Sequence, residues 1–149
     1  MVYAAAEGAA VGFAMGLYCD EIRNGIAAYK TVGRRGAVTD TGFITLVDDC
    51  YNANPDSVKC AIDSMCASRG RKVCILGDML EMGTARAERH ADIGRYAVSH
   101  GVELLLCVGE MSENTARAAE GIASLHFDSN AALIAELPKL IKKGDTVLV

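Results

Sequence analysis

Tryptophan is absent from the 149 residues, and aromatic residues make up only 5% of the chain. A platform that stacks nucleic-acid bases needs aromatic side chains, so this shortage argues against one. The formal net charge of −4 also provides no general basic field for a nucleic acid. We therefore expect no nucleic-acid partner.

Membrane and secretion signals are missing too. Glu7 and Asp20 interrupt the apolar N-terminal segment, and no basic region precedes it as in a secretory signal. The cysteines show no Cys-x-x-Cys spacing, and with three histidines the chain has no pattern of metal ligands. We expect a cytoplasmic protein with no membrane span and no metal site of its own, in which reduced cysteines pack the interior. These cysteines are Cys19, Cys50, Cys60, Cys66, Cys74 and Cys107.

A phosphate-binding loop of the form Gly-x-x-x-x-Gly-Lys-Ser/Thr is also missing. Residues 77–83 carry glycines after a strand-like run, but no Lys-Ser/Thr pair follows them. The carboxylates of Asp78 and Glu81 would moreover repel phosphate. The chain alone is therefore not expected to hydrolyse ATP.

What is present is 51% hydrophobic content, enough for one ordinary core. Continuous apolar runs alternate with helical periodicity, which predicts an α/β fold: a three-layer, Rossmann-like domain with a mostly parallel sheet. Residues 37–47 predict an antiparallel hairpin with its turn at 40–42. Pro138 is expected to kink or split the last helix. The other predicted strands cover 72–77, 103–109, 125–127 and 146–149, and the predicted helices cover 55–67, 85–99, 112–123 and about 133–141.

Two helices precede this domain. Residues 3–17 are small and apolar, which predicts a helix buried on most sides, and residues 20–29 predict a second one. The Gly- and Arg-rich segment 31–37 is typical of a hinge. We therefore divide the chain into residues 1–36, two helices and a hinge, and residues 37–149, the α/β domain. The apolar faces of the helices favour self-association.

The chain is organised around residues 48–57, where an apolar strand runs into a polar cluster. Asn54 suits the N-cap of a helix, and Pro55 suits its first position. A well-capped turn explains these residues, but it does not explain why Asp48, Asp49, Tyr51 and Asn52 crowd at the end of a strand. The carboxyl ends of strands are where α/β sheets bind ligands, so the cluster predicts a ligand site.

The same stretch carries a family resemblance. Residues 46–57, Leu-Val-Asp-Asp-Cys-Tyr-Asn-Ala-Asn-Pro-Asp-Ser, resemble the Asp-x-Tyr-Asn-Ala-Asn-Pro-x-Ser motif of the Mur ligases. Val32-Gly33-Arg34 and residues 75–83, Ile-Leu-Gly-Asp-Met-Leu-Glu-Met-Gly, fit the same family in the same order. The resemblance runs from about Tyr3 to the last residue. It is to the members that join D-alanyl-D-alanine to UDP-N-acetylmuramoyl-tripeptide in peptidoglycan synthesis.

The resemblance implies an ATP-dependent, amide-bond-forming ligase. The family uses ATP and Mg²⁺ to phosphorylate a carboxylate, and the amine of the second substrate attacks the resulting acyl phosphate. Residues 1–36 would then be the tail of the central ATPase domain, and 37–149 a C-terminal domain truncated at its end. Such a fragment would supply the lid half of a split site and be inactive alone, with no catalytic residue of its own.

Several binding residues follow from the resemblance. Arg34 matches the arginine that reaches ATP on closure. Asp49 matches the aspartate that contacts the nucleotide ribose or the hinge region, although a one-residue slip would put Asp48 in its place. Tyr51 either stacks on adenine or packs on the helix. Arg35 is the better candidate for a solvated linker charge. The full set of predicted nucleotide contacts is Arg34, Asp49, Tyr51 and Asn52.

The predicted substrate contacts are Asn52, Asn54, Asp78 and Glu81. The acidic pair Asp78 and Glu81 would hold an ammonium group of the dipeptide, or else lie in a solvated loop. Asn54 has the alternative of a purely structural cap. His90 matches a family histidine, but its predicted helix face favours a structural, half-buried side chain.

Two other functions stay open on the residues alone. One is a non-catalytic, Rossmann-like binding module that shares the motif. The other is a different amide ligase of the superfamily, such as a folylpolyglutamate synthase. The Tyr-Asn-Ala-Asn-Pro run, in place of a Gly-Ala-His-Asn-Pro run, argues against the second.

Overall fold

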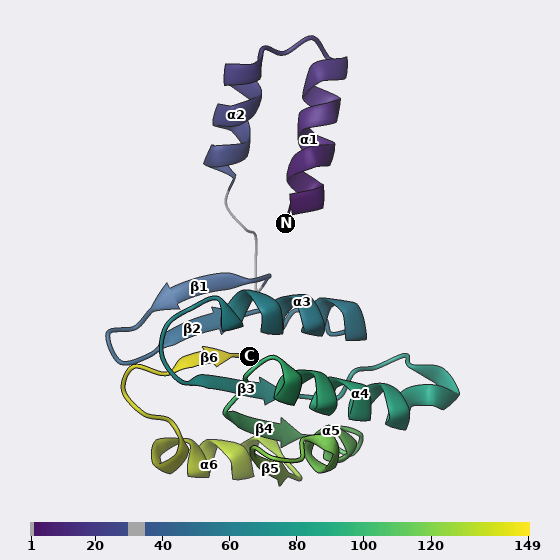
Figure 1. The fold of residues 1–149 in the computed structure, drawn as a ribbon, viewed down its shortest axis with the longest axis vertical. Coiled ribbons are helices and arrows are strands. Elements are labelled where there is room, and N and C mark those ends of the chain that lie inside the picture. The colour runs from purple at the N-terminus through teal and green to yellow at the C-terminus, as the bar shows by residue number, and fades with distance from the viewer. Residues whose placement is uncertain (1, 30–34) are drawn as a thin grey trace. The chain divides into compact units, whose positions relative to one another are not determined.

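The computed structural model describes residues 2–29 and 35–149, with side-chain burial given from residue 4 onward. The chain forms two compact units, Met1–Val32 and Gly33–Val149. Figure 1 shows the two helices of the first unit and the sheet and helices of the second. Each unit is described by itself below.

The first unit is a helical hairpin of α1 (Val2–Ala14) and α2 (Cys19–Ala28). Gly12 of α1 packs against Ile22 of α2, since a Cβ on Gly12 would lie 2.8 Å from Ile22 Cγ1. The prediction that the first helix is buried on most sides is wrong for this unit: Val11 is 58% exposed and Phe13 59%. A single partner helix covers one stripe of α1 and leaves its other apolar faces open.

The second unit contains a six-stranded sheet in the order β1-β2-β6-β3-β4-β5. β1 pairs with β2 antiparallel, and the other neighbouring strands pair parallel. The predicted mostly parallel sheet with an antiparallel hairpin at its start is thus confirmed. The strands are β1 (Ala37–Asp40), β2 (Thr45–Asp48), β3 (Lys72–Leu76), β4 (Leu104–Val108), β5 (Ala123–Phe127) and β6 (Thr146–Leu148).

Helices pack on both faces of this sheet. Alternate strand residues such as Cys74 and Leu148 join the core cluster of one face, and Val73 and Val147 join that of the other. The first face carries α3 (Pro55–Cys66), α4 (Arg86–Ser99), which follows a 3-10 turn (Gly83–Ala85), and α5 (Ser112–Ala118). The second face carries α6 (Asn130–Leu140). The three predicted layers are therefore present (Figure 1).

One helix prediction was wrong in detail, and one alternative of a second is excluded. The helix expected over 112–123 ends at Ala118, because Gly121 adopts a φ of 94° and turns the chain into β5. The last helix is not split at Pro138 and continues to Leu140. Pro138 lies in its last turn, where it removes only the hydrogen bond to the carbonyl of Ile134, a residue that is 62% exposed.

The prediction that the cysteines pack the interior holds for Cys74 and Cys107, which are buried, and is wrong for Cys19, Cys50 and Cys60, which are exposed. Burial raises the pKa of the Cys107 thiol to about 12, and it raises the pKa of Cys74 as well. Both thiols therefore stay protonated and unreactive at neutral pH. None of the described helices is long and apolar enough to cross a bilayer.

Candidate functional site

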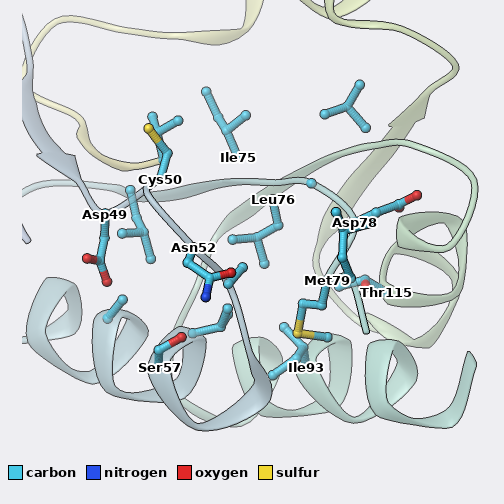
Figure 2. Close-up of a pocket in the computed structure, with 18 of the residues that line it drawn as sticks. Asp49, Cys50, Asn52, Ser57, Ile75, Leu76, Asp78, Met79, Ile93 and Thr115 are labelled. Carbon is cyan, nitrogen blue, oxygen red and sulfur yellow. The ribbon is translucent and has the colours of Figure 1, made fainter. Parts of the chain in front are cut away.

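A pocket of about 400 Å³ opens where β2, β6, β3 and β4 end. Parallel strands end at the same edge of a sheet, and the loops that leave these ends form the walls of the pocket. One wall comes from residues 49–53, between β2 and α3, and another from residues 77–80, after β3. Residues of α3, α4 and α5 and Asn130 of α6 (Asn130–Leu140) add to the lining (Figure 2). The two motifs that the sequence singled out therefore meet in one pocket.

The end of β2 presents Asp49 to this pocket. The Asp49 N–H donates to the Val149 carbonyl over 2.8 Å, and the Val149 N–H donates to the Val47 carbonyl over 2.9 Å. These bonds fix the backbone just beyond β2, and Asp49 lines the pocket. Asp48 is not part of the lining; its carboxylate accepts the Cys50 thiol at 3.0 Å. Of the two aspartates, Asp49 therefore has the geometry for a ligand contact.

Asn54 begins α3 as its N-cap, as the sequence predicted. Its Oδ1 accepts the Ser57 N–H over 2.9 Å, and its own N–H donates to Ser57 Oγ over 3.1 Å. Asn54 is exposed and lies outside the pocket lining. The structure thus accounts for Asn54 as a cap, and its substrate contact stays a prediction.

Tyr51 and Asn52 lie at the mouth of the pocket. Among the described residues, the Asn52 carboxamide makes no hydrogen bond, so its donor and acceptor are available to a ligand. The Tyr51 ring is 66% exposed, and the guanidinium of Arg35 lies 4.2 Å from its centroid. Arg35, expected to be a solvated linker charge, therefore packs on a residue of the site. Arg34 lies outside the described residues.

The loop after β3 separates the predicted acidic pair. Asp78 lines the pocket, but its Oδ1 accepts the N–H of Ser112 over 2.7 Å at the start of α5. In Figure 2 its carboxylate points away from Asn52. Glu81 is exposed, has a φ of 59° and is not among the lining residues. Only one of the two carboxylates therefore reaches the pocket, and ammonium binding by the pair stays a prediction.

His90 supports this loop from within the core. It is fully buried; its Nε2 accepts the Met79 N–H over 2.9 Å and its Nδ1 donates to the Arg86 carbonyl over 2.7 Å. Because an amide can only donate and a carbonyl can only accept, these partners require the neutral tautomer with the proton on Nδ1. Both ring nitrogens are occupied, in agreement with the structural role that the sequence favoured.

Thr115 is a polar lining residue that sequence reasoning missed. It lies in the short helix α5, is 2% exposed, and borders the pocket near the buried side chains of Met79 and Ile93. A lone threonine in a polar helix gives no sequence signal. Only the packing of α5 against α4 brings it to this place.

The charges of the lining limit what the pocket can bind. It contains the carboxylates of Asp49 and Asp78 and no Lys or Arg among the described residues. Such a wall suits a neutral or cationic group, for example the sugar and base of a nucleoside or an amine, and repels phosphate. Among the described residues no three His, Cys, Asp or Glu side chains gather as metal ligands. A phosphate group therefore meets no positively charged side chain of this lining among the described residues.

Comparison with known proteins agrees with the motifs. Residues 33–149 match the family model described as "Mur ligase, glutamate ligase domain". The chain is 32% identical over 142 residues to the UDP-N-acetylmuramoyl-tripeptide–D-alanyl-D-alanine ligase of Escherichia coli, covering 95% of this chain and 31% of the relative. The Treponema pallidum protein of the same name is 33% identical over 145 residues, 91% of this chain and 30% of that protein.

Solved structures show the same fold. A crystal structure of MurF from Acinetobacter baumannii superposes with a TM-score of 0.82 at 24% identity, covering 94% of this chain and 31% of that one. MurF ligase from Thermotoga maritima in complex with ADP gives a TM-score of 0.79 at 26% identity, covering 93% and 31%. The chain thus spans about a third of the length of these relatives.

Proposed function

Because this chain belongs to the Mur ligase family, we propose that it forms the C-terminal, lid part of an ATP-dependent ligase. The complete enzyme would join D-alanyl-D-alanine to UDP-N-acetylmuramoyl-tripeptide in the cytoplasm, as a step of peptidoglycan synthesis. One observation carries this proposal: residues 49–53 and 77–80, taken from the two family motifs, line a single pocket. The relatives in E. coli and T. pallidum are both UDP-N-acetylmuramoyl-tripeptide–D-alanyl-D-alanine ligases, which supports the choice of substrates.

The reaction in this proposal proceeds through an acyl phosphate of the tripeptide carboxylate, which the dipeptide amine attacks. In this reaction the chain's own residues bind the nucleotide and the dipeptide and orient them. The Asp49 carboxylate accepts hydrogen bonds from hydroxyl groups such as those of a ribose, and the Asn52 carboxamide offers a donor and an acceptor. The Tyr51 ring supplies a flat apolar surface for a base. Arg34 completes the proposed nucleotide contacts from the hinge.

The dipeptide contacts are proposed for the same loops. Asn52 lies in the lining, and Asp78 adds a negative charge that favours an ammonium group. Asn54 and Glu81 flank the pocket on loops that adjoin it, and they are proposed as outer contacts. The triphosphate and Mg²⁺ are assigned to other parts of the complete ligase, because this lining carries neither cations nor a cluster of metal ligands among its described residues.

The first unit is proposed to be the tail of the central ATPase domain, with residues 37–149 as the C-terminal domain. Its exposed apolar side chains favour association with a second copy when the chain is isolated. Light scattering on the 149-residue chain and on residues 35–149 tests this. Dimers of the full chain and monomers of the shorter one are expected, and equal masses would refute self-association through the helices. These side chains include Val11, Phe13, Met15, Leu17, Tyr18 and Ile26.

A hybrid ligase tests the proposed function. In it, residues 33–149 replace the matching C-terminal segment of the E. coli relative. The hybrid is expected to join the dipeptide to the tripeptide with ATP, whereas the 149-residue chain alone should neither ligate nor hydrolyse ATP. A folded hybrid without activity, beside an active parent, would refute the function. Magnesium-dependent ATP hydrolysis by the pure chain would refute its assignment to the lid.

A further inference from the structure

Thr115 brings a buried hydroxyl to the pocket. The residue is 2% exposed, and it lines the pocket together with Met79, His90 and Ile93, all of them buried. In Figure 2, Thr115 and Asp49 lie on opposite sides of Asn52. Thr115 therefore marks the end of the pocket that lies away from the β2 loop.

The Thr115 hydroxyl makes no hydrogen bond within the described part of the chain. In that same part, no fully buried side-chain nitrogen or oxygen lacks a partner. The Thr115 oxygen is therefore not fully buried, and because Thr115 lines the pocket, we infer that this oxygen faces its open space. A hydroxyl in this position gains from any ligand group that completes its hydrogen bond.

The backbone holds this hydroxyl in place. The Thr115 carbonyl packs so closely on Gly94 of α4 that a Cβ there would lie 2.2 Å from it. α5 therefore cannot shift toward α4 to bury the hydroxyl elsewhere. A donor or acceptor on a packed helix is better positioned for recognition than one on a loop.

The polar neighbours already have partners. His90 uses both ring nitrogens on the Met79 N–H and the Arg86 carbonyl. Asp78 Oδ1 accepts the Ser112 N–H. The side chains of Met79 and Ile93 are apolar, so a ligand that reaches this end of the pocket meets apolar walls, the Thr115 hydroxyl and the nearby carboxylate of Asp78.

We propose that Thr115 is a specificity-determining residue that hydrogen-bonds a neutral polar group of the pocket ligand, such as an amide or a hydroxyl. The proposal rests on the proposed function, in which this pocket faces both the dipeptide and the nucleoside. Both ligands carry such groups, and the test separates them. An anionic group is disfavoured here, because Asp78 lines the same pocket and no Lys or Arg among the described residues does.

The test titrates the 149-residue chain with D-alanyl-D-alanine and, separately, with adenosine, while NMR follows the Thr115 methyl and amide signals. One of the two ligands is expected to shift these signals. Thr115→Val should weaken that ligand's Kd by about three- to tenfold, whereas Thr115→Ser, which keeps the hydroxyl, should change it by less than about twofold. The ligand affected identifies the source of the polar group.

Thermal melts distinguish a role of the Thr115 hydroxyl in ligand recognition from a role in stabilising the fold. A hydroxyl that supports the fold loses stability on Thr115→Val, whereas one without a partner does not, so the valine variant should melt at or above the wild-type temperature. Thr84→Val, at an exposed threonine outside the lining, is the matched control and should leave binding unchanged. Absence of any ligand-induced shift at Thr115, or equal binding by the Val and Ser variants, overturns the proposal. If the hybrid ligase is active while either of these two results is obtained, the proposed function stands and only the role of Thr115 is refuted. An inactive hybrid ligase refutes both proposals.

Discussion

The guanidinium of Arg35 lies over the ring of Tyr51, 4.2 Å from its centroid. The two residues flank the β1–β2 hairpin, with Arg35 just before β1 and Tyr51 just after β2. A cation on one face of the ring limits how the ring can turn, and the ring stands at the pocket mouth. The contact therefore couples the segment before the hairpin to the ligand loop.

Removal of this contact should weaken nucleotide binding in the hybrid ligase. An exposed cation–π pair contributes roughly 0.5–1 kcal/mol, so Arg35→Ala should raise the KM for ATP about two- to fivefold and leave kcat nearly unchanged. Arg35→Lys should fall between Ala and wild type, because it keeps the charge without the planar stack. Arg89→Ala, at an exposed arginine of α4 outside the pocket, serves as control. If Arg35→Ala and Arg89→Ala behave alike in steady-state kinetics, the contact has no role in binding.

Gly109 should tolerate no side chain. Its φ is 116°, and a Cβ on it would lie 2.6 Å from the carboxylate carbon of Asp78. Gly109→Ala therefore adds backbone strain to a clash that disturbs the Asp78–Ser112 bond, and we expect a loss of about 3 kcal/mol. Gly101 also has a positive φ, of 81°, but a Cβ on it would meet no heavy atom within 4 Å. Gly101→Ala should therefore lower the free energy of unfolding by only about 1 kcal/mol. Urea unfolding of the 149-residue chain measures both, and equal losses would show that the Asp78 contact does not restrict this position.

Arg71 and Asp145 join the start of β3 to the turn before β6. Arg71 Nε and Nη2 donate to the two carboxylate oxygens over 3.0 and 2.6 Å, and the Lys142 N–H adds a bond of 2.7 Å. Burial alone would raise the pKa of the Asp145 carboxyl. The hydrogen bond and charge of Arg71 and the bond from Lys142 outweigh burial, so the pKa lies below its ordinary value.

A depressed carboxyl pKa stabilises the fold above the unfolded pKa of about 4, and that contribution is lost as the pH falls through the folded pKa. We expect Asp145→Asn to cost about 2 kcal/mol at pH 7 and progressively less below about pH 4. Asp92→Asn, which breaks the half-exposed pair with Arg95, should cost well under 1 kcal/mol. Free energies of unfolding of the variants and the wild type, measured across this pH range, test both expectations. A constant difference between Asp145→Asn and wild type would show that Asp145 does not carry the effect.

The features that the sequence predicted are those set by neighbouring residues. The turn at Asp40 is one, because the Asp40 carboxylate accepts the Gly42 N–H over 2.8 Å within the turn itself. The Asn54 cap is another, since its partner Ser57 lies in the first helical turn. The strands were also predictable, because helices cover both faces of the sheet and leave continuous apolar runs.

The features that it missed depend on residues far apart in the chain. The Asp78 carboxylate was predicted as one of an ammonium-binding pair, yet it accepts an N–H from the start of α5. Thr115 enters the pocket because α5 packs on α4, and Arg35 meets Tyr51 because the hairpin brings them together. No periodicity or motif in the sequence encodes these long-range contacts, which form only once the strand order of the sheet is established. The family resemblance located the pocket, but not the partners of its side chains.

Asp49 should matter for catalysis in the hybrid ligase, and Asn54 for stability. Asp49 lines the pocket, and its carboxylate makes no hydrogen bond among the described residues, so it is available to a ligand. A charged contact made mainly in the closed, reacting state lowers kcat more than it raises KM. Asp49→Ala should therefore reduce kcat by about thirty- to a thousandfold, or roughly 2–4 kcal/mol. Steady-state kinetics with saturating peptide substrates measure this.

Asp48 and Asn54 provide the two comparison variants for Asp49→Ala. Asp48→Ala removes the neighbouring carboxylate, which is not part of the lining and accepts the Cys50 thiol, and should reduce kcat far less than Asp49→Ala. The reverse order would mean that Asp48 holds the ligand, one residue from where the pocket places it. Asn54→Ala should lower the free energy of unfolding by about 1 kcal/mol through its lost cap, and change kcat little at temperatures well below the melt. A large loss of kcat in a stable Asn54→Ala variant would instead make Asn54 a ligand contact, because loss of a cap acts on folding and not on a reacting group.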